Sequence, residues 1–127
     1  MIKETIYGQV VAKANHYKAV PGKNGERRII KDQTVRNYET SFCLQCRTYK
    51  GKQVNRPFRF VVDVYNIHSN FDLDNSIKTI LDCLQYCDAI TNDNLLVELQ
   101  ATKHVSKTPR VEFGIEVLQK DLFDIQT

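Results

Sequence analysis

Three features that other classes of protein need are missing from this sequence of 127 residues. No apolar run approaches the ~18 residues that a membrane-spanning helix requires, which argues against an integral membrane protein. The opening MIKETIYGQV lacks the charged-then-apolar layout of a signal peptide, so we expect a cytoplasmic protein. Low-complexity segments, internal repeats and domain linkers are also missing. We therefore expect one domain over residues 1–127, and its 42% hydrophobic content suits a single core.

The net charge of +3 conceals a strong asymmetry along the chain. From Lys13 to Arg59 there are twelve Lys and Arg residues against three acidic ones, a balance of +9. From Asp72 to Glu98 there are six acidic residues against one Lys, a balance of −5. A basic half beside an acidic cluster suits a polyanion-binding surface around a cation-binding centre. Ordinary solvated faces are the alternative.

Two segments carry apolar residues at helical spacing. The first runs from Asp32, which can act as N-cap, to about Lys50. The second starts at Asp74 or Asn75 and runs to about Tyr86. Its inward-facing residues are expected to be Ile77, Ile80, Leu81 and Leu84.

Four segments alternate as strands do. They are residues 6–14, residues 58–67 (FRFVVDVYNI), residues 94–105 and residues 110–118, with SKTP forming a hairpin turn between the last two. In residues 94–105 the inward face is expected to hold Leu95, Val97, Leu99 and Ala101. Residues 15–32 read as a long loop or an irregular hairpin. The order β-α-β-α-β-β predicts an α+β fold with a mixed sheet and two main helices.

The stretch FDLDN sets Asp72 and Asp74 one residue apart where a strand appears to give way to a helix. Two carboxylates ~4 Å apart repel by about 4 kcal/mol at an effective dielectric of 20. A divalent cation between them relieves that repulsion, and oxygen ligands select Mg²⁺ or Mn²⁺. Lys78 falls one turn after Asp74, and Asp93 precedes the next strand and can complete the site. Three carboxylates and a lysine suit phosphodiester hydrolysis; helix capping and a surface ion pair are the alternative.

These residues carry a resemblance to a known family. FDLDNSIKTILDCL, followed by AITNDNLLVELQATK, resembles the RusA family of Holliday-junction resolvases. That signature has Asp-x-Asp-Asn, a Lys four residues after the second Asp, then Leu-Asp-Ala-Leu, and an Asp-Asp pair before a strand. The matching positions here are Asp72, Asp74, Asn75, Lys78, Asp82 and Asp93. The similarity is specific over about residues 71–103 and looser elsewhere.

The resemblance implies a homodimeric, RusA-like endodeoxyribonuclease of recombination and repair from a bacterium or phage. It would cut four-way DNA junctions symmetrically with Mg²⁺ or Mn²⁺ and no small-molecule cofactor. Asp72, Asp74 and Asp93 would be the metal ligands, and Lys78 the catalytic lysine. Two departures stand out: HSNF before Asp72 lacks the arginine run of some members, and Asn92 replaces the first Asp of the later pair. The second motivates an alternative, a branched-DNA-binding protein with weak or lost nuclease activity.

The basic region complements the acidic centre. Its cations and aromatic side chains can contact DNA phosphates, which positions DNA without reading its sequence. The candidate DNA-binding residues are Lys13, His16, Tyr17, Lys18, Arg27, Arg28, Lys31 and Arg36. A loop with no binding role is the alternative.

The spacing of two cysteine pairs is compatible with a zinc site. Cys43 and Cys46 form a CxxC, and Cys83 and Cys87 lie four residues apart in the second predicted helix. Four thiolates from helices packed side by side would suit a tetrahedral zinc ion in an interaction module. Both pairs lie inside predicted helices, which favours buried free thiols instead.

Overall fold

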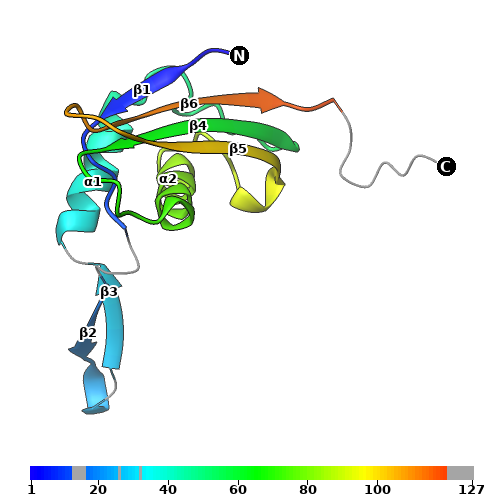
Figure 1. The fold of residues 1–127 in the computed structure, drawn as a ribbon. Coiled ribbons are helices and arrows are strands. Elements are labelled where there is room, and N and C mark those ends of the chain that lie inside the picture. The colour runs from blue at the N-terminus through cyan, green and yellow to red at the C-terminus, as the bar shows by residue number, and fades with distance from the viewer. Residues whose placement is uncertain (13–16, 26, 32, 120–127) are drawn as a thin grey trace.

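The computed structural model describes residues 1–12, 17–25, 27–31 and 33–119 (Figure 1). Its elements are β1 (Glu4–Tyr7), β2 (Tyr17–Pro21), β3 (Arg27–Lys31), α1 (Gln33–Gln45), β4 (Phe58–Asn66), α2 (Leu73–Tyr86), β5 (Leu96–Val105) and β6 (Arg110–Val117), with short 3-10 turns η2 (Lys23–Gly25) and η3 (Asp93–Leu95). The predicted order of the main elements is confirmed. Of the two readings of residues 15–32, the hairpin is the correct one, because β2 and β3 pair antiparallel.

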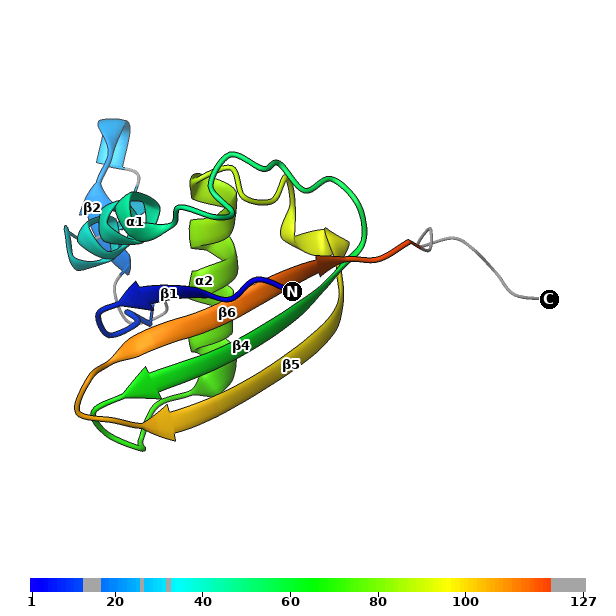
Figure 2. The same ribbon diagram turned by 90° about the horizontal axis from the view of Figure 1, so that it is seen from above.

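The main sheet has four strands in the order β1-β6-β4-β5. β4 is parallel to β5 and antiparallel to β6, and β6 is antiparallel to β1. Both helices lie on the same face of this sheet (Figures 1 and 2). The α+β fold with a mixed sheet and two main helices is therefore confirmed.

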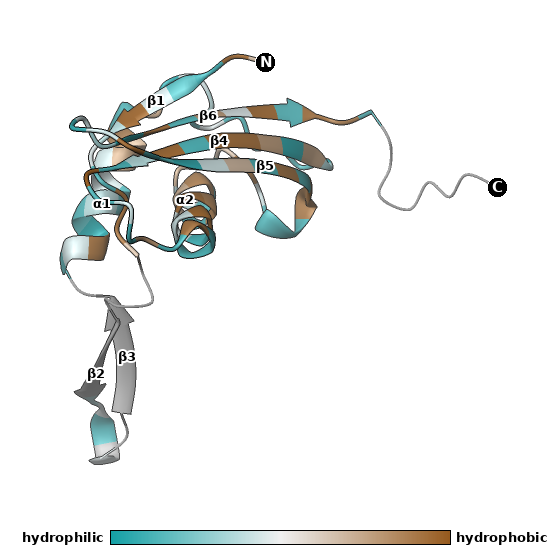
Figure 3. Ribbon diagram, in the orientation of Figure 1, coloured by the Kyte–Doolittle hydropathy of each residue, from teal (hydrophilic) through white to brown (hydrophobic). Residues whose placement is uncertain are grey.

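The core forms between the central strand and α2. β4 alternates buried and half-buried residues along its whole length, so one face of the strand packs against the helices. All the residues predicted to face inward on β4 and α2 are buried: Phe58, Phe60, Val62, Val64, Ile77, Ile80, Leu81 and Leu84. Figure 3 shows the apolar residues on α2 and on the strands of the sheet. Burying each large apolar side chain contributes about 1.5–3 kcal/mol.

α1 ends at Gln45, so the prediction of a helix to about Lys50 is wrong by five residues. The reason lies in β1. The buried carboxylate of Glu4 accepts hydrogen bonds from the backbone N–H groups of Arg47, Thr48 and Tyr49, at 3.0–3.2 Å. These groups therefore have a partner outside the helix, and the chain leaves the helical path.

The first strand covers only residues 4–7, not the predicted 6–14. Gly8 ends it with φ +111°, a conformation that favours glycine, and donates to Pro109 O at 3.0 Å. At the outer edge of β1 the side chain of Gln45 pairs with the free backbone of Tyr7. Its Oε1 accepts from Tyr7 N (2.7 Å) and its Nε2 donates to Tyr7 O (2.9 Å).

β5 forms the other edge of the sheet. The predicted inward face of residues 94–105 is confirmed at Leu95 and Ala101, which pack against the core, and differs at the other two positions. A register shift against β4 at Phe58/Arg59 pairs Phe58 with Leu96 and Arg59 with Glu98, so the alternation changes at Val97. Leu96 packs against the core, whereas Val97 is 38% and Leu99 49% exposed. Within the described residues, no helix is long and apolar enough to cross a membrane.

Candidate active site

The start of α2 holds the two closely spaced aspartates. Asp72 is the N-cap, so the prediction of Asp74 or Asn75 in that position is wrong by two or three residues. The carbonyl of Asp72 accepts from the backbone N and Oγ of Ser76, at 3.2 and 3.1 Å. The Asp72 side chain caps no backbone N–H, and it accepts from Asn75 Nδ2 at 3.3 Å. Both carboxylates are exposed, and the positive end of the helix dipole favours negative charge there.

Asp72 lines a small cavity rich in oxygen atoms. Other polar side chains around this space of about 190 Å³ are Asn66, Asn70, Asn75 and Ser76. Asn66 ends β4 and is only 5% exposed, yet its Oδ1 has no hydrogen-bond partner among the described residues. A buried amide oxygen without a partner costs about 1–3 kcal/mol. Such a cost is typical of a position where a ligand, an ion or a water molecule completes the coordination.

Asp74 and Lys78 border a different space. They lie one turn apart along a groove of about 510 Å³ between α2 and β5. The walls of the groove are apolar: Leu73, Ile77, Leu81, Leu96, Leu99 and Ala101. Both charged side chains are exposed, and neither forms an ion pair with another described residue. The two groups are therefore available to a ligand.

Within one chain, the fold does not bring Asp93 to the start of α2. β4 and β5 are parallel, with Phe58 opposite Leu96 and Asn66 opposite Val105. Asp72 follows the end of β4, and Asp93 precedes the start of β5, so the two lie toward opposite ends of these strands. Asp93 N instead donates to Gln85 Oε1, near the end of α2, at 2.8 Å. No cluster of three or more His, Cys, Asp or Glu side chains suited to a metal exists in the described part of the chain.

Asn92, the departure from the family pattern, has a local structural role. Its Oδ1 accepts from Asn94 N at 2.9 Å and caps η3. Asp82, another position of the resemblance, is half-buried on α2.

No sequence pattern pointed to Lys103 as part of this region. From β5 its Nζ donates to the carbonyls of Ser69 and Phe71, at 3.0 and 3.3 Å, and it lies 5.1 Å from the centre of the Phe71 ring. These contacts fix the segment that leads into Asp72.

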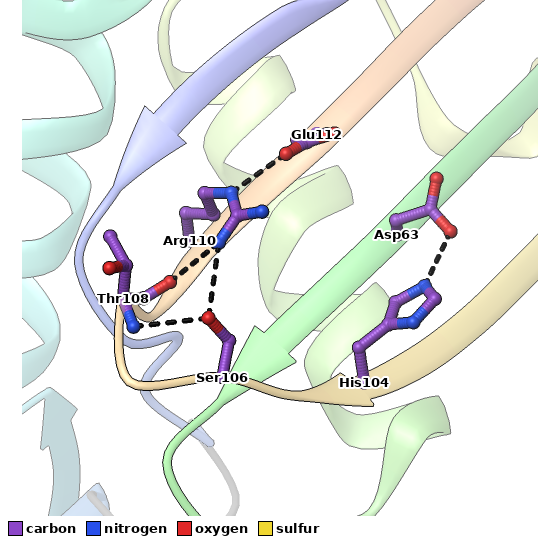
Figure 4. Close-up of polar contacts among 6 residues, drawn as sticks. All are labelled: Asp63, His104, Ser106, Thr108, Arg110 and Glu112. Carbon is purple, nitrogen blue, oxygen red and sulfur yellow. Dashed lines mark hydrogen bonds and ion pairs between the residues drawn. The ribbon is translucent and has the colours of Figure 1, made fainter.

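The outer face of the sheet carries a polar network near the end of β4, the strand end that leads toward Asp72 (Figure 4). His104 Nε2 lies 2.8 Å from Asp63 Oδ1, and Arg110 bonds Glu112, Ser106 and Thr108. The hydrogen bond to Glu112 raises the pKa of Arg110. Ser106 N donates to the carbonyl of Asn66 at 2.9 Å, so the turn between β5 and β6 holds the end of β4 in place.

The predicted DNA-binding residues divide into three groups. Tyr17 and Lys18 lie on β2, while Arg27, Arg28 and Lys31 lie on β3; Tyr17 pairs with Lys31 across the hairpin. Arg36 is exposed on α1. Lys13 and His16 lie outside the described residues. The DNA-binding role of all eight stays a prediction.

The four cysteines are free, and they do not form the cluster that a zinc site needs. Cys46, Cys83 and Cys87 are buried, and Cys43 is half-buried. The Cys46 thiol donates to Glu4 Oε1 at 3.2 Å. The prediction that the cysteines are buried is therefore confirmed for Cys46, Cys83 and Cys87 and is wrong for Cys43.

Comparison with known proteins adds an independent result. Residues 8–116 match the model of a family described as Endodeoxyribonuclease RusA. A relative from Aquifex aeolicus (strain VF5), the crossover junction endodeoxyribonuclease RusA, is 30% identical over 101 residues, which cover 76% of this chain and 75% of that protein.

Proposed function

Because this chain belongs to the RusA family of endodeoxyribonucleases, we propose that it resolves four-way DNA junctions by hydrolysing phosphodiester bonds with a divalent metal ion. The family assignment predicted from residues 71–103 is confirmed by the comparisons. A nuclease domain over the whole chain, a role in recombination and repair, a homodimer and a cytoplasmic location are parts of this proposal. The observation that supports it most directly is the oxygen-lined cavity beside Asp72.

The side chains around that cavity fit a hard cation. Asp72 offers a carboxylate, and Asn66 offers a buried amide oxygen without a partner. Oxygen donors of this kind suit Mg²⁺ or Mn²⁺. A divalent cation held there would activate a water molecule and stabilise charge on the phosphate.

The chain's own residues position the DNA. Lys78 lies one turn after Asp74 on the same side of α2, where its ammonium group can neutralise a phosphate oxygen. The start of α2 favours an anion through its free N–H groups. The cations of β2, β3 and Arg36 would bind phosphates further along the DNA, which makes the affinity strongly dependent on salt.

A branched-DNA-binding protein without nuclease activity is the second candidate. Asn92 supports it, because its side-chain oxygen caps η3 and replaces a carboxylate of the family pattern. This candidate predicts tight, salt-sensitive binding to junctions and no nicking with any divalent metal.

Cleavage of a labelled four-way junction separates the two candidates. With Mg²⁺ or Mn²⁺ we expect the wild type to cut the junction and to leave matched duplex and flap DNA largely intact. Asp74→Asn should lower the rate by at least about 10²-fold, because it removes a carboxylate that the family resemblance assigns to the metal ion. Asp88→Asn is the matched control: Asp88 is exposed after α2, and Asn tolerates its φ of +59°. Equal rates for the two variants would contradict the assignment of Asp74.

Asn66→Leu tests the cavity without measuring cleavage. Removing a buried oxygen that lacks a partner should raise the free energy of unfolding by about 1 kcal/mol. The same change should weaken Mn²⁺ binding about tenfold or more. Thermal unfolding and calorimetric Mn²⁺ titration measure the two effects, with Asn55→Leu at an exposed site as control. Unchanged Mn²⁺ affinity would remove Asn66 from the site.

A further inference from the structure

Two buried cysteines lie together in a part of the core that the proposed nuclease function does not use. Cys46 directly follows α1 and is 1% exposed, and Cys87 is the C-cap of α2 and is 4% exposed. Their thiols are hydrogen-bonded to each other. A disulfide has a sulfur–sulfur distance of ~2.05 Å, so two thiols already in contact need only a small movement to form one.

Three backbone hydrogen bonds join the loop after α1 to the end of α2. Gly51 N donates to the carbonyl of Cys87 at 3.1 Å, and the next two bonds run from residues 53–54 to the carbonyls of residues 88–89, at 2.8 and 3.0 Å. The backbone therefore holds the two cysteine positions side by side, and their contact does not depend on side-chain rotamers alone.

The two thiols have different chemical surroundings. Cys46 Sγ also lies 3.2 Å from Glu4 Oε1, so its one proton has two acceptors within reach. The hydrogen bond to Cys87, burial and the Glu4 carboxylate all raise the pKa of Cys46. The hydrogen bond from Cys46 lowers the pKa of Cys87 against the effect of burial, and backbone N–H groups and the charge of Lys50 act in the same direction. Cys87 is therefore the sulfur that ionises first, and the thiolate is the nucleophile in thiol chemistry.

The other two cysteines have different positions. Cys83 lies one turn earlier than Cys87 on α2, beside Tyr38. Cys43 lies on α1, one turn before Cys46, and is half-buried. Exposure alone would make Cys43 the most readily oxidised of the four cysteines, so the site of oxidation distinguishes exposure from pairing.

We propose that Cys46 and Cys87 form a disulfide when the protein meets a peroxide, with Cys87 as the attacking thiol and Cys46 as the resolving thiol. With hydrogen peroxide, the Cys87 thiolate attacks one oxygen: an S–O bond forms, the O–O bond breaks, and the leaving hydroxide takes the proton that Cys87 released, as water. Cys46 then gives its proton to Glu4 and attacks the Cys87 sulfur. The S–S bond forms, the S–O bond breaks, and the departing hydroxide takes the proton from Glu4. The two thiols are oxidised by two electrons, and the peroxide is reduced to two water molecules.

The disulfide would link the ends of the two helices. α1 begins at Gln33, directly after the β2–β3 hairpin, so the bond would fix the helix that follows the predicted DNA-binding hairpin against α2. It would also cross-link positions more than forty residues apart, which restricts the unfolded chain and stabilises the fold. The inference does not depend on nuclease activity.

Peptide mapping of peroxide-treated protein gives the decisive test. The fully reduced chain is treated with hydrogen peroxide, unfolded, alkylated at its remaining thiols, digested and analysed by mass spectrometry. We expect fragment spectra to show Cys46 joined to Cys87, while Cys43 and Cys83 are alkylated. A bond that joins other cysteines, or oxidation of Cys43 while Cys46 and Cys87 stay reduced, overturns the inference. The wild type alone suffices for this measurement, so it does not depend on how well a variant folds.

Serine variants test the two roles. In Cys46→Ser the reaction should stop at a sulfenic acid on Cys87, which dimedone labels, and Cys87→Ser should give neither label nor disulfide. Cys43→Ser is the matched control on α1 and should form the disulfide as the wild type does. Dimedone labelling of Cys46 in Cys87→Ser, with none of Cys87 in Cys46→Ser, would overturn the assigned roles.

Thermal unfolding tests whether the fold accommodates the bond. The oxidised wild type should melt about 5–10 °C above the reduced protein, and dithiothreitol should reverse the shift. Cys46→Ser should show no such rise after the same treatment. A wild-type Tm that is unchanged or lower after oxidation would contradict a disulfide compatible with this fold.

Discussion

The two edges of the sheet present different surfaces to the surroundings. On β1 the side chain of Gln45 bonds both backbone groups of Tyr7, and Glu4 anchors the loop after α1. On β5 the edge has no pairing strand among the described residues, and leucine and valine side chains are exposed along it. Proteins usually shield the unpaired backbone groups of an edge strand that must not pair with another chain. The difference indicates that β1 is closed within the chain and that β5 is available for association.

The largest effect is expected from a charge on the open edge. Leu99→Lys places an ammonium group on the open β5 edge of each copy in the proposed homodimer and exposes none of the core, because Leu99 is already 49% exposed. The dimer dissociation constant should rise at least ~100-fold through lost apolar contact and like-charge repulsion. Light scattering over a dilution series measures it.

Tyr7→Lys is the matched control on the closed edge, since Tyr7 is 60% exposed on β1. It should leave the dimer dissociation constant close to that of the wild type. A monomeric wild type, or equal masses for the two variants at every concentration, would contradict the difference between the edges.

A smaller effect is expected from Glu4, which holds the loop after α1 against the closed β1 edge. Burial acts to raise the pKa of Glu4, but hydrogen bonds from Thr48, Cys46, Tyr49 and Arg47 outweigh it, so the pKa lies below 4.5. Glu4→Gln should lower the free energy of unfolding at pH 7 by about 2 kcal/mol, because buried N–H donors lose a charged acceptor.

The pH dependence of this variant follows from the direction of the pKa shift. The ionised carboxylate stabilises the fold fully above the unfolded-state pKa, near 4.5, and this contribution is lost as the pH falls through the lower folded-state pKa. Urea unfolding of wild type and Glu4→Gln from pH 7 to pH 3 should therefore show the difference shrinking in acid. If the difference in the free energy of unfolding between the two proteins stayed constant across that range, the destabilisation of Glu4→Gln would come from packing and not from the lost charge.

Local patterns were sufficient to predict much of this fold. The alternation of β4 and the apolar stripe of α2 are properties of neighbouring residues, and both describe the core correctly. The end of α1 was not predictable in this way, because Glu4 reaches it from more than forty residues away. The register shift at Val97 likewise depends on the pairing with β4.

The site was predicted less completely than the fold. Asp72 caps α2, and Asp74 and Lys78 lie in its first two turns, but Asp72 lines the cavity beside Asn66 whereas Asp74 and Lys78 border the groove beside β5. The unpaired oxygen of Asn66 depends on what surrounds the end of β4, and no sequence pattern signals it. The separation of Asp93 was foreseeable: a helix between two parallel strands returns the chain to the opposite end of the sheet. Within one chain, Asp93 therefore lies toward the opposite end of β4 and β5 from Asp72.

The smallest effect is expected at the glutamine that closes β1. Gln45→Ala removes two hydrogen bonds to an exposed backbone segment, so the free energy of unfolding should fall by only about 1 kcal/mol. The local consequence is more specific, because the amide of Tyr7 loses its acceptor and should exchange with solvent faster. Gln100→Ala, on the open edge, should leave that amide unchanged. If Tyr7 stays equally protected in Gln45→Ala, then the pairing with β6 closes the β1 edge by itself, and the contrast with β5 rests on exposed apolar side chains alone.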